Sequence, residues 1–150
     1  MQTENLVINR DVYDAMLTAA RKASPLEACG LLGGKHGQAT EFYELTNADA
    51  SGEHYSMILE EQFAAIKGIR AKGIEMLAIW HSHPASLAQM SEEDLRLAYT
   101  PDIVYVILSL ADAERPQIRG FVVNDGRPEE TAIRIREATP SNIASGSEVT

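Results

Sequence analysis

The sequence predicts a single α/β domain, in which strands and helices follow one another along most of the chain. Residues 11–23 and 59–72 carry apolar side chains at helical spacing, whereas 74–80 and 103–110 are almost continuously apolar, as buried strands are. The 150 residues suffice for one sizeable core and contain no internal repeat or linker. We expect a domain over residues 1–137, followed by a polar, disordered tail over 138–150.

Composition and charge limit the function classes. An apolar content of 45 % is ordinary for a globular domain, and no apolar run approaches the ~20 residues of a membrane span. The N-terminus lacks the basic start and apolar core of a signal peptide, so a cytoplasmic location is expected. A net charge of −9 excludes a nucleic-acid backbone as partner but not a basic protein. The single cysteine excludes an intramolecular disulfide, which is compatible with a reducing compartment.

The N-terminal third predicts a strand, a helix and a second strand. The first strand is Leu6–Ile8, and Asp11 is expected to cap a helix that runs to Ala23. Pro25 ends this helix because the residue before a proline is pushed out of the helical region. Pro25–Gly34 then predicts an apolar strand closed by two glycines. The expected buried face of the helix consists of Val12, Ala15, Met16, Ala19 and Ala23.

The middle of the chain predicts a strand, a polar loop and a second helix. A turn over 35–37 leads into a strand over 38–45, and the polar loop 47–52 precedes a short strand over 55–57. The helix 59–72 follows, and Gly73 ends it. Its expected buried stripe consists of Leu59, Phe63, Ile66 and Ile69.

The remaining elements follow the apolar run 74–80. A helix that starts at Ser91 is expected to end before Pro101 and to bury Leu95, Ala98 and Tyr99. Further strands are predicted over 103–110, 117–123 and 131–136, with a turn at 124–126 between the last two.

Two histidines follow the apolar run 74–80. Side chains alternate along a strand, so His81 and His83 point to the same side and can bind one metal ion. Pro84 stops the strand because it has no N–H to donate. Taken alone, a histidine at a strand end is more often a surface or hydrogen-bonded residue than a ligand. The pair therefore gains weight only from its neighbours.

The segment Ser91-Glu92-Glu93-Asp94 supplies such a neighbour. Ser91 and Asp94 have the spacing of a helix N-cap and its third residue, and this helix start can direct Asp94 back to the two histidines. Two nitrogens and one carboxylate oxygen are the ligand set of a catalytic zinc site with one open position. Capping alone explains Ser91 and Asp94 equally well, and one geometry serves both roles.

Four further residues have more than one interpretation or no assigned role. Glu27 is either a solvent-exposed acid at a strand start or a general base near the metal. Cys29 is most simply a small buried hydrophobic residue, since a thiolate as fourth protein ligand would close the site to water. His36 is expected in solvent, whereas His54 has no predicted partner, and neither is assigned a role.

Together these residues resemble a known family. The pattern Pro-x-Glu-x-Cys-Gly-Leu-Leu-x-Gly, then His-Ser-His-Pro, then Ser-x-x-Asp, is similar to the signature of the JAMM (MPN-plus, Mov34/PAD-1) metalloproteases. The resemblance covers roughly residues 6–136. It implies a mixed β-sheet flanked by helices, as in cytidine deaminases, and one zinc ion held by His81, His83 and Asp94. It also implies Glu27 as general base and Ser91 as the residue that steadies the tetrahedral intermediate.

One position departs from the family pattern. Many relatives have proline before the motif serine, where this chain has Met90, which affects the rigidity of the loop 85–90 and not the ligand set. The chain is also too short for the long insertions of the eukaryotic deubiquitinating members. It therefore resembles the compact prokaryotic members, some of which cleave at the C-terminus of ubiquitin-like sulfur-carrier proteins.

Three functions are compatible with the sequence. The first is a zinc peptidase in which metal-activated water attacks the amide and Glu27 transfers the proton. The second is a binding module that docks a ubiquitin-like protein around a structural metal, and the third is a hydrolase of small amides. An intact Glu27 favours the peptidase. We expect the loops 47–55 and 85–90 to hold a Gly-Gly tail by main-chain hydrogen bonds, with Leu87 and Met90 covering it.

Overall fold

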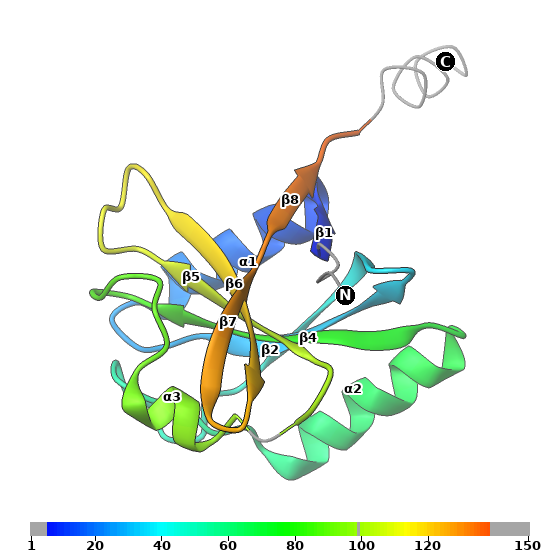
Figure 1. Cartoon of the computed structure of the whole chain (residues 1–150), viewed down its shortest axis with the longest axis horizontal. Helices are drawn as coiled ribbons and strands as arrows, with labels where there is room; N and C mark the ends of the chain where they lie inside the picture. Colours follow the sequence, from blue (N-terminus) through cyan, green and yellow to red (C-terminus); the bar gives the residue numbers. More distant parts are fainter. Residues whose placement is uncertain (1–5, 99, 139–150) are drawn as a thin grey trace.

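The structure, a computed structural model, describes residues 6–98 and 100–138, which form an eight-stranded sheet and three helices (Figure 1). The predicted tail residues 139–150 lie outside the described part, as does Tyr99. The elements, in chain order, are β1 (Leu6–Asn9), α1 (Arg10–Ala23), β2 (Cys29–Lys35), β3 (Gln38–Leu45), α2 (Leu59–Ala71), β4 (Glu75–His83), α3 (Glu92–Arg96), β5 (Val104–Ser109), β6 (Gln117–Asn124), β7 (Arg127–Thr131) and β8 (Ile133–Arg136).

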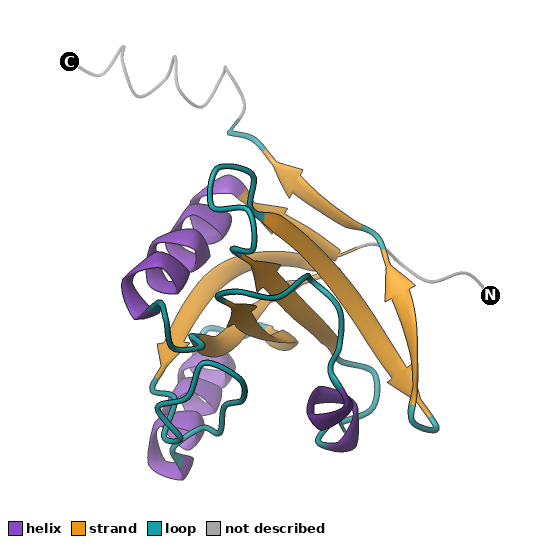
Figure 2. Ribbon diagram, turned by 90° about the vertical axis from the view of Figure 1, so that its left-hand side faces the viewer, coloured by secondary structure: helices purple, strands orange, loops and turns teal. Residues whose placement is uncertain are grey.

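The sheet is mixed, as expected. Its strand order is β7-β6-β5-β4-β2-β3-β1-β8, and β1 pairs with β3 and β8 in parallel, as β4 does with β5. The other neighbouring strands are antiparallel. The strands curve into an arch, and α3 lies near the β6–β7 hairpin (Figure 2). None of the helices within residues 6–98 and 100–138 is long and apolar enough to cross a membrane.

The described residues form four clusters of buried apolar side chains. The two largest lie on opposite faces of the central strands, one beneath α1 and one beneath α2 (Figure 1). Alternation along β2 separates them, because Leu32 packs in the α1 cluster and Leu31 in the α2 cluster. On β4, Trp80 packs toward α1, whereas Ile79 packs toward α2. His81 and His83 therefore continue the α2 face of the sheet beyond Ile79.

Helix α1 starts one residue before the predicted cap. It begins at Arg10, so Asn9 holds the N-cap position, and the Asn9 side chain accepts a hydrogen bond from Gln38 Nε2 at 2.8 Å. Asp11 is instead in the first turn, where a carboxylate faces the positive end of the helix dipole. The buried side chains of α1 are Val12, Met16, Ala19 and Ala20.

Two of the four residues that were predicted to form the buried stripe of α2 are exposed. Ile69 is buried, but Leu59 and Phe63 are 59 % and 58 % exposed, and Ala65 is the second buried residue. Leu59 and Phe63 therefore lie on a side of α2 that the other described residues leave exposed. The short strand expected at 55–57 is reduced to one isolated bridge between Asn47 and Met57.

The strand that carries the histidines ends before Pro84, as predicted, whereas the helix predicted after it was too long. β4 includes both histidines and ends at His83; β5 pairs with it as far as His83, and β2 as far as His81. Helix α3 has five residues and ends at Arg96. Thr100 precedes Pro101, which disfavours the helical region at this point, and its N–H donates to the Tyr105 hydroxyl at 3.1 Å.

The C-terminal strand predicted over 131–136 is two strands. β7 ends at Thr131, and β8 crosses to the opposite edge of the sheet and pairs with β1. β7 was missed because it contains Pro128 and charged residues, which an edge strand tolerates. The turn before β7 was predicted, and Asp125 and Gly126 both adopt positive φ there.

Candidate metal centre

The two histidines stand at the end of β4, inside the sheet. His81 is opposite Cys29 of β2 and Ile107 of β5, and His83 is opposite Ser109. Both side chains are buried, and their Nε2 atoms lie 3.1 Å apart. The Leu87 carbonyl lies 2.8 Å from Nδ1 of His83 and accepts its proton, which leaves Nε2 free to bind a cation.

Asp94 reaches the same point from α3. Its Oδ2 lies 3.3 Å from Nε2 of His81 and 3.2 Å from Nε2 of His83. A capping box fixes this carboxylate, because Ser91 N–H donates to Asp94 Oδ2 and Asp94 N–H donates to Ser91 Oγ, both at 3.0 Å. Burial opposes ionisation of Asp94, but its contacts with the two histidines outweigh this effect and lower its pKa. The helix start thus serves as cap and as ligand support.

These three atoms fit a tetrahedral zinc ion. Zinc bonds of ~2.0–2.1 Å in tetrahedral geometry separate neighbouring ligand atoms by ~3.3–3.4 Å. The observed separations of 3.1, 3.2 and 3.3 Å agree with this value. Two imidazole nitrogens and one carboxylate oxygen are also a ligand set that zinc prefers.

Glu27 lies beside the same histidines, 54 residues upstream of His81. It precedes β2, and its side chain is 3 % exposed, so the solvent-exposed reading was wrong. Ligand atoms of Glu27, His81 and His83 lie within 4.8 Å of one another. Among the described residues, Glu27 Oε1 has no hydrogen-bond partner. Burial raises the pKa of Glu27 to about 7, against the attraction of His83. Such a carboxyl group is suited to exchanging protons near neutral pH.

The two histidines belong to two overlapping groups of three residues, one completed by Asp94 and the other by Glu27. In the group with Asp94 the ligand atoms lie within 3.3 Å of one another, whereas in the group with Glu27 they lie within 4.8 Å. The shorter contacts match neighbouring ligands of one ion. The longer reach leaves space for a small molecule such as water between Glu27 and the ligands. The arrangement can therefore separate metal binding from proton transfer.

Ser82 and Tyr55 support the site, and neither was identified from the sequence. Ser82 lies between the histidines, where its Oγ accepts the Ala28 N–H at 2.8 Å. A serine within an apolar strand was the available signal, because a buried hydroxyl requires a partner. The Tyr55 ring stacks on His81, with centroids 4.7 Å apart. No local sequence pattern predicts that contact.

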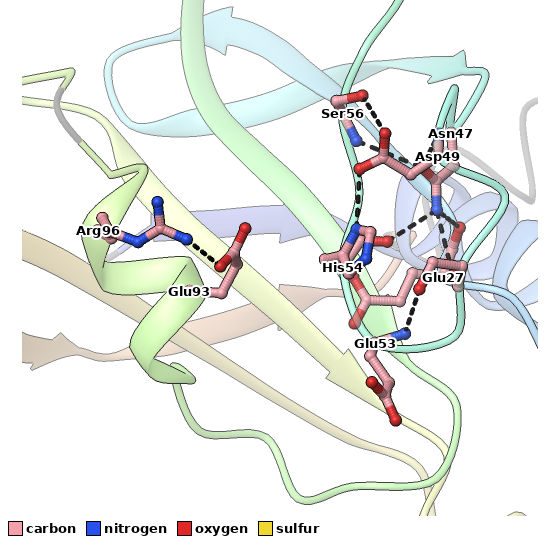
Figure 3. Close-up of polar contacts among 9 residues, drawn as sticks. Glu27, Asn47, Asp49, Glu53, His54, Ser56, Glu93 and Arg96 are labelled. Carbon is pink, nitrogen blue, oxygen red and sulfur yellow. Dashed lines mark hydrogen bonds and ion pairs between the residues drawn. The ribbon is translucent and has the colours of Figure 1, made fainter.

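A cleft opens beside Ser91, between the loop 47–57 and α3. Its volume is about 520 Å³, and Figure 3 shows its two walls, with Glu53 and His54 on one side and Glu93 and Arg96 on the other. Ser91 is exposed, and its hydroxyl oxygen caps α3 by accepting the Asp94 N–H. On the other predicted wall, Leu87 is 60 % exposed, whereas Met90 packs partly into the core against Ala88 and Ile107.

Cys29, His36 and His54 are not members of the metal-binding cluster, although Cys29 lies opposite His81 in the sheet. Cys29 is fully buried, and burial raises its thiol pKa to about 12, as expected of a structural cysteine. His36 is exposed in a turn with positive φ. His54 is also exposed, and its hydrogen bond with Asp49, at 2.8 Å, raises its pKa.

The family follows from comparison with known proteins. A family model described as prokaryotic homologs of the JAB domain matches residues 9–121, which includes all five predicted site residues. The chain belongs to this JAB-domain family. A CysO-cysteine peptidase of Mycobacterium tuberculosis is 34 % identical over 134 residues, which cover 88 % of this chain and 92 % of that protein. A desampylase of Haloferax volcanii is 29 % identical over 116 residues, 73 % of this chain and 84 % of that protein.

Solved structures agree with the JAB-domain fold. A solution structure from Desulfitobacterium hafniense has a TM-score of 0.82 and 38 % identity, covering 91 % of this chain and 96 % of that one. A JAB1/MPN domain protein of Archaeoglobus fulgidus has a TM-score of 0.58 at 21 % identity, covering 89 % of this chain and all of that one, and supports the fold alone. The expected mixed α/β architecture is therefore confirmed.

Proposed function

We propose that this JAB-domain protein is a zinc-dependent peptidase that hydrolyses the amide bond after the C-terminal glycine of a ubiquitin-like or sulfur-carrier protein. The observation that carries the proposal is the convergence of His81, His83 and Asp94 within 3.3 Å beside a buried Glu27, whose Oε1 has no partner among the described residues. The names of two relatives, a CysO-cysteine peptidase and a desampylase, support the same substrate class.

His81 Nε2, His83 Nε2 and Asp94 Oδ2 are the proposed ligands of one zinc ion per chain. Zinc held there would supply Lewis-acid activation of water and positive charge for the developing oxyanion. The Leu87 carbonyl fixes the His83 tautomer, and the Ser91 N–H orients the Asp94 carboxylate. Each of these protein contacts keeps a ligand atom directed at the same point.

Glu27 is the proposed general base and acid. Its carboxylate takes a proton from the attacking water and then delivers it to the leaving amine, a role typically worth ~10²–10⁴-fold in rate. Burial supports the return step, because it favours the protonated form of Glu27. Ser91 is the proposed second donor to the oxyanion, through the hydroxyl proton that capping leaves free.

An extended glycine tail is the proposed substrate segment. β4 is paired with β2 as far as His81 and with β5 as far as His83, so we expect main-chain contacts to a tail to come from the loops 47–55 and 85–90. Glycine allows close approach of the tail backbone to the metal. Leu87 is exposed and can cover the tail, whereas Met90 supports the loop from the core side.

The test uses purified, zinc-loaded enzyme and carrier-protein fusions with Gly-Gly or Gly-Val at the junction, followed by mass spectrometry. We expect cleavage after Gly-Gly and loss with Gly-Val. Glu27→Gln should retain the metal and lose turnover by about 10²-fold or more, because glutamine cannot accept the proton. Equal cleavage of both fusions, or of neither, would favour a small-amide hydrolase or a binding module. Activity within a few-fold of wild type in Glu27→Gln would remove Glu27 from the mechanism.

A further inference from the structure

We propose that Asn47 is the positioning residue of the general base, and that it joins Glu27 to one wall of the substrate cleft. The inference rests on the proposed function, since it assumes that Glu27 transfers the proton. It concerns a loop residue outside the resemblance described above. The argument starts from the main chain of Glu27, which no strand holds, because β2 begins at Cys29.

Asn47 uses both ends of its side-chain amide. Its Nδ2 group donates to the Glu27 carbonyl at 3.1 Å, to the His54 carbonyl at 3.1 Å and to the Ser51 carbonyl at 3.3 Å (Figure 3). Its Oδ1 accepts the Asp49 N–H at 3.0 Å and the Ser56 N–H at 3.3 Å. One side chain therefore organises the loop 47–57 and attaches it to the base.

The peptide groups around Glu27 are held from two sides. On the loop side, Glu27 N–H donates to the Ser51 carbonyl at 2.8 Å, and Asn47 binds the Glu27 carbonyl. On the β4 side, Ala28 N–H donates to Ser82 Oγ at 2.8 Å, and Ser82 N–H donates to the Ala28 carbonyl at 2.9 Å. The Glu27 carboxylate itself has an Oε1 without a partner among the described residues. Its position thus depends on these main-chain contacts.

The loop that Asn47 organises is also a cleft wall. Glu53 and His54 line the cleft of about 520 Å³ beside Ser91. Two contacts of Asp49 stiffen this wall: its carboxylate accepts from Ser56 Oγ at 2.9 Å and pairs with His54. A substrate that contacts this wall is therefore mechanically linked to the base through Asn47. Loss of the link should reduce kcat more than it raises KM.

The decisive variant is Asn47→Asp. Aspartate keeps the acceptor bonds to Asp49 and Ser56 but loses the donors to Glu27, Ser51 and His54. We expect kcat to fall by about 10-fold to 100-fold, as small misplacements of catalytic groups do, with KM within about three-fold of wild type. Asn124→Asp is the matched control: it makes the same amide-to-carboxylate change at an exposed position at the end of β6, and its kcat should stay within about two-fold.

A double-mutant cycle separates positioning from general damage to the fold. If Asn47 acts through Glu27, then Asn47→Asp should cost nothing further in the residual rate of Glu27→Gln. If Asn47→Asp lowered the rate by the same factor in the wild-type enzyme and in Glu27→Gln, the proposal would be overturned. A Glu27→Gln enzyme with normal turnover would overturn it as well, and would trace the failure to the proposed function.

Amide hydrogen exchange gives a second readout, in metal-free protein and without turnover. In Asn47→Asp, the Glu27 amide, which donates to Ser51, should exchange about 10-fold faster, because its local opening becomes easier. The Leu110 amide, which donates to the His83 carbonyl and has no contact with Asn47, is the internal reference and should keep its rate. Unchanged exchange at Glu27, or equal acceleration at both amides, would contradict a specific role of Asn47.

Discussion

Ser82 and Ala28 exchange two hydrogen bonds: Ala28 N–H donates to Ser82 Oγ at 2.8 Å, and Ser82 N–H donates to the Ala28 carbonyl at 2.9 Å. Ser82 stands between the two proposed histidine ligands, and Ala28 follows the proposed base. The pair therefore sets the distance between the metal strand and Glu27. Both residues are buried, so no solvent replaces the side-chain bond.

Ser82→Ala should test this contact. It leaves the buried Ala28 N–H without its acceptor, which costs about 1–3 kcal/mol in the free energy of unfolding. Chemical denaturation measures this loss, and kcat should fall as Glu27 loses its fixed distance from the histidines. Ser86→Ala is the control, since Ser86 is exposed and should change stability by less than about 0.5 kcal/mol. Equal stability of both variants would exclude a structural role for the Ser82 hydroxyl.

The ligand assignment predicts zinc loss in three variants. His81→Ala, His83→Ala and Asp94→Ala each leave two ligands, so bound zinc after dialysis should fall well below one per chain. His36→Ala and His54→Ala are the matched controls and should retain zinc, because both histidines are exposed and outside the cluster. Elemental analysis of the five proteins decides this. Full zinc retention in the three site variants would refute the assignment.

The raised pKa of Glu27 predicts that the stability of the metal-free protein depends on pH. Its folded pKa is raised by burial from 4.5 to about 7, so folding binds a proton between these values. The stability contributed by protonated Glu27 is complete below pH 4.5 and is lost as the pH rises through about 7. Glu27→Gln lacks this titration. The difference in the free energy of unfolding, Glu27→Gln minus wild type, should therefore increase by about 1–3 kcal/mol between pH 5 and pH 8.

The measurement is urea denaturation at several pH values in the presence of a chelator. Glu53→Gln serves as control, since Glu53 is exposed and lies in the same region. A constant difference between Glu27→Gln and wild type from pH 5 to pH 8 would contradict the raised pKa.

Two apolar residues of α2 differ in burial, so their substitution should have different effects on stability. Ile69 is 2 % exposed, so Ile69→Ala should lower the free energy of unfolding by about 2–4 kcal/mol. Phe63 is 58 % exposed, and Phe63→Ser should change it by less than about 0.5 kcal/mol. Thermal and chemical denaturation compare the two variants. A large loss in Phe63→Ser would mean that something covers this face of α2 in solution.

The sequence by itself determined that His81 and His83 point to the same side of their strand. Side chains alternate along any strand, so this holds whatever the rest of the fold does. It also determined the capping box, since Ser91 and Asp94 are three residues apart and bond locally. The turn at Asp125 and Gly126 was likewise predicted, because its residues favour positive φ. These features depend on contacts between near neighbours in the chain.

The tertiary structure alone decided which distant residues meet. Antiparallel pairing of β2 with β4 brings the segment of Glu27 to the histidines, and the loop at Asn47 then holds its main chain. The sheet also decided that Pro128 lies in an edge strand and that Phe63 lies outside the core. Local patterns show that a face is apolar or that a residue can ionise. Burial and partners depend on what packs against that face, and the packing is fixed by strand order over the whole chain.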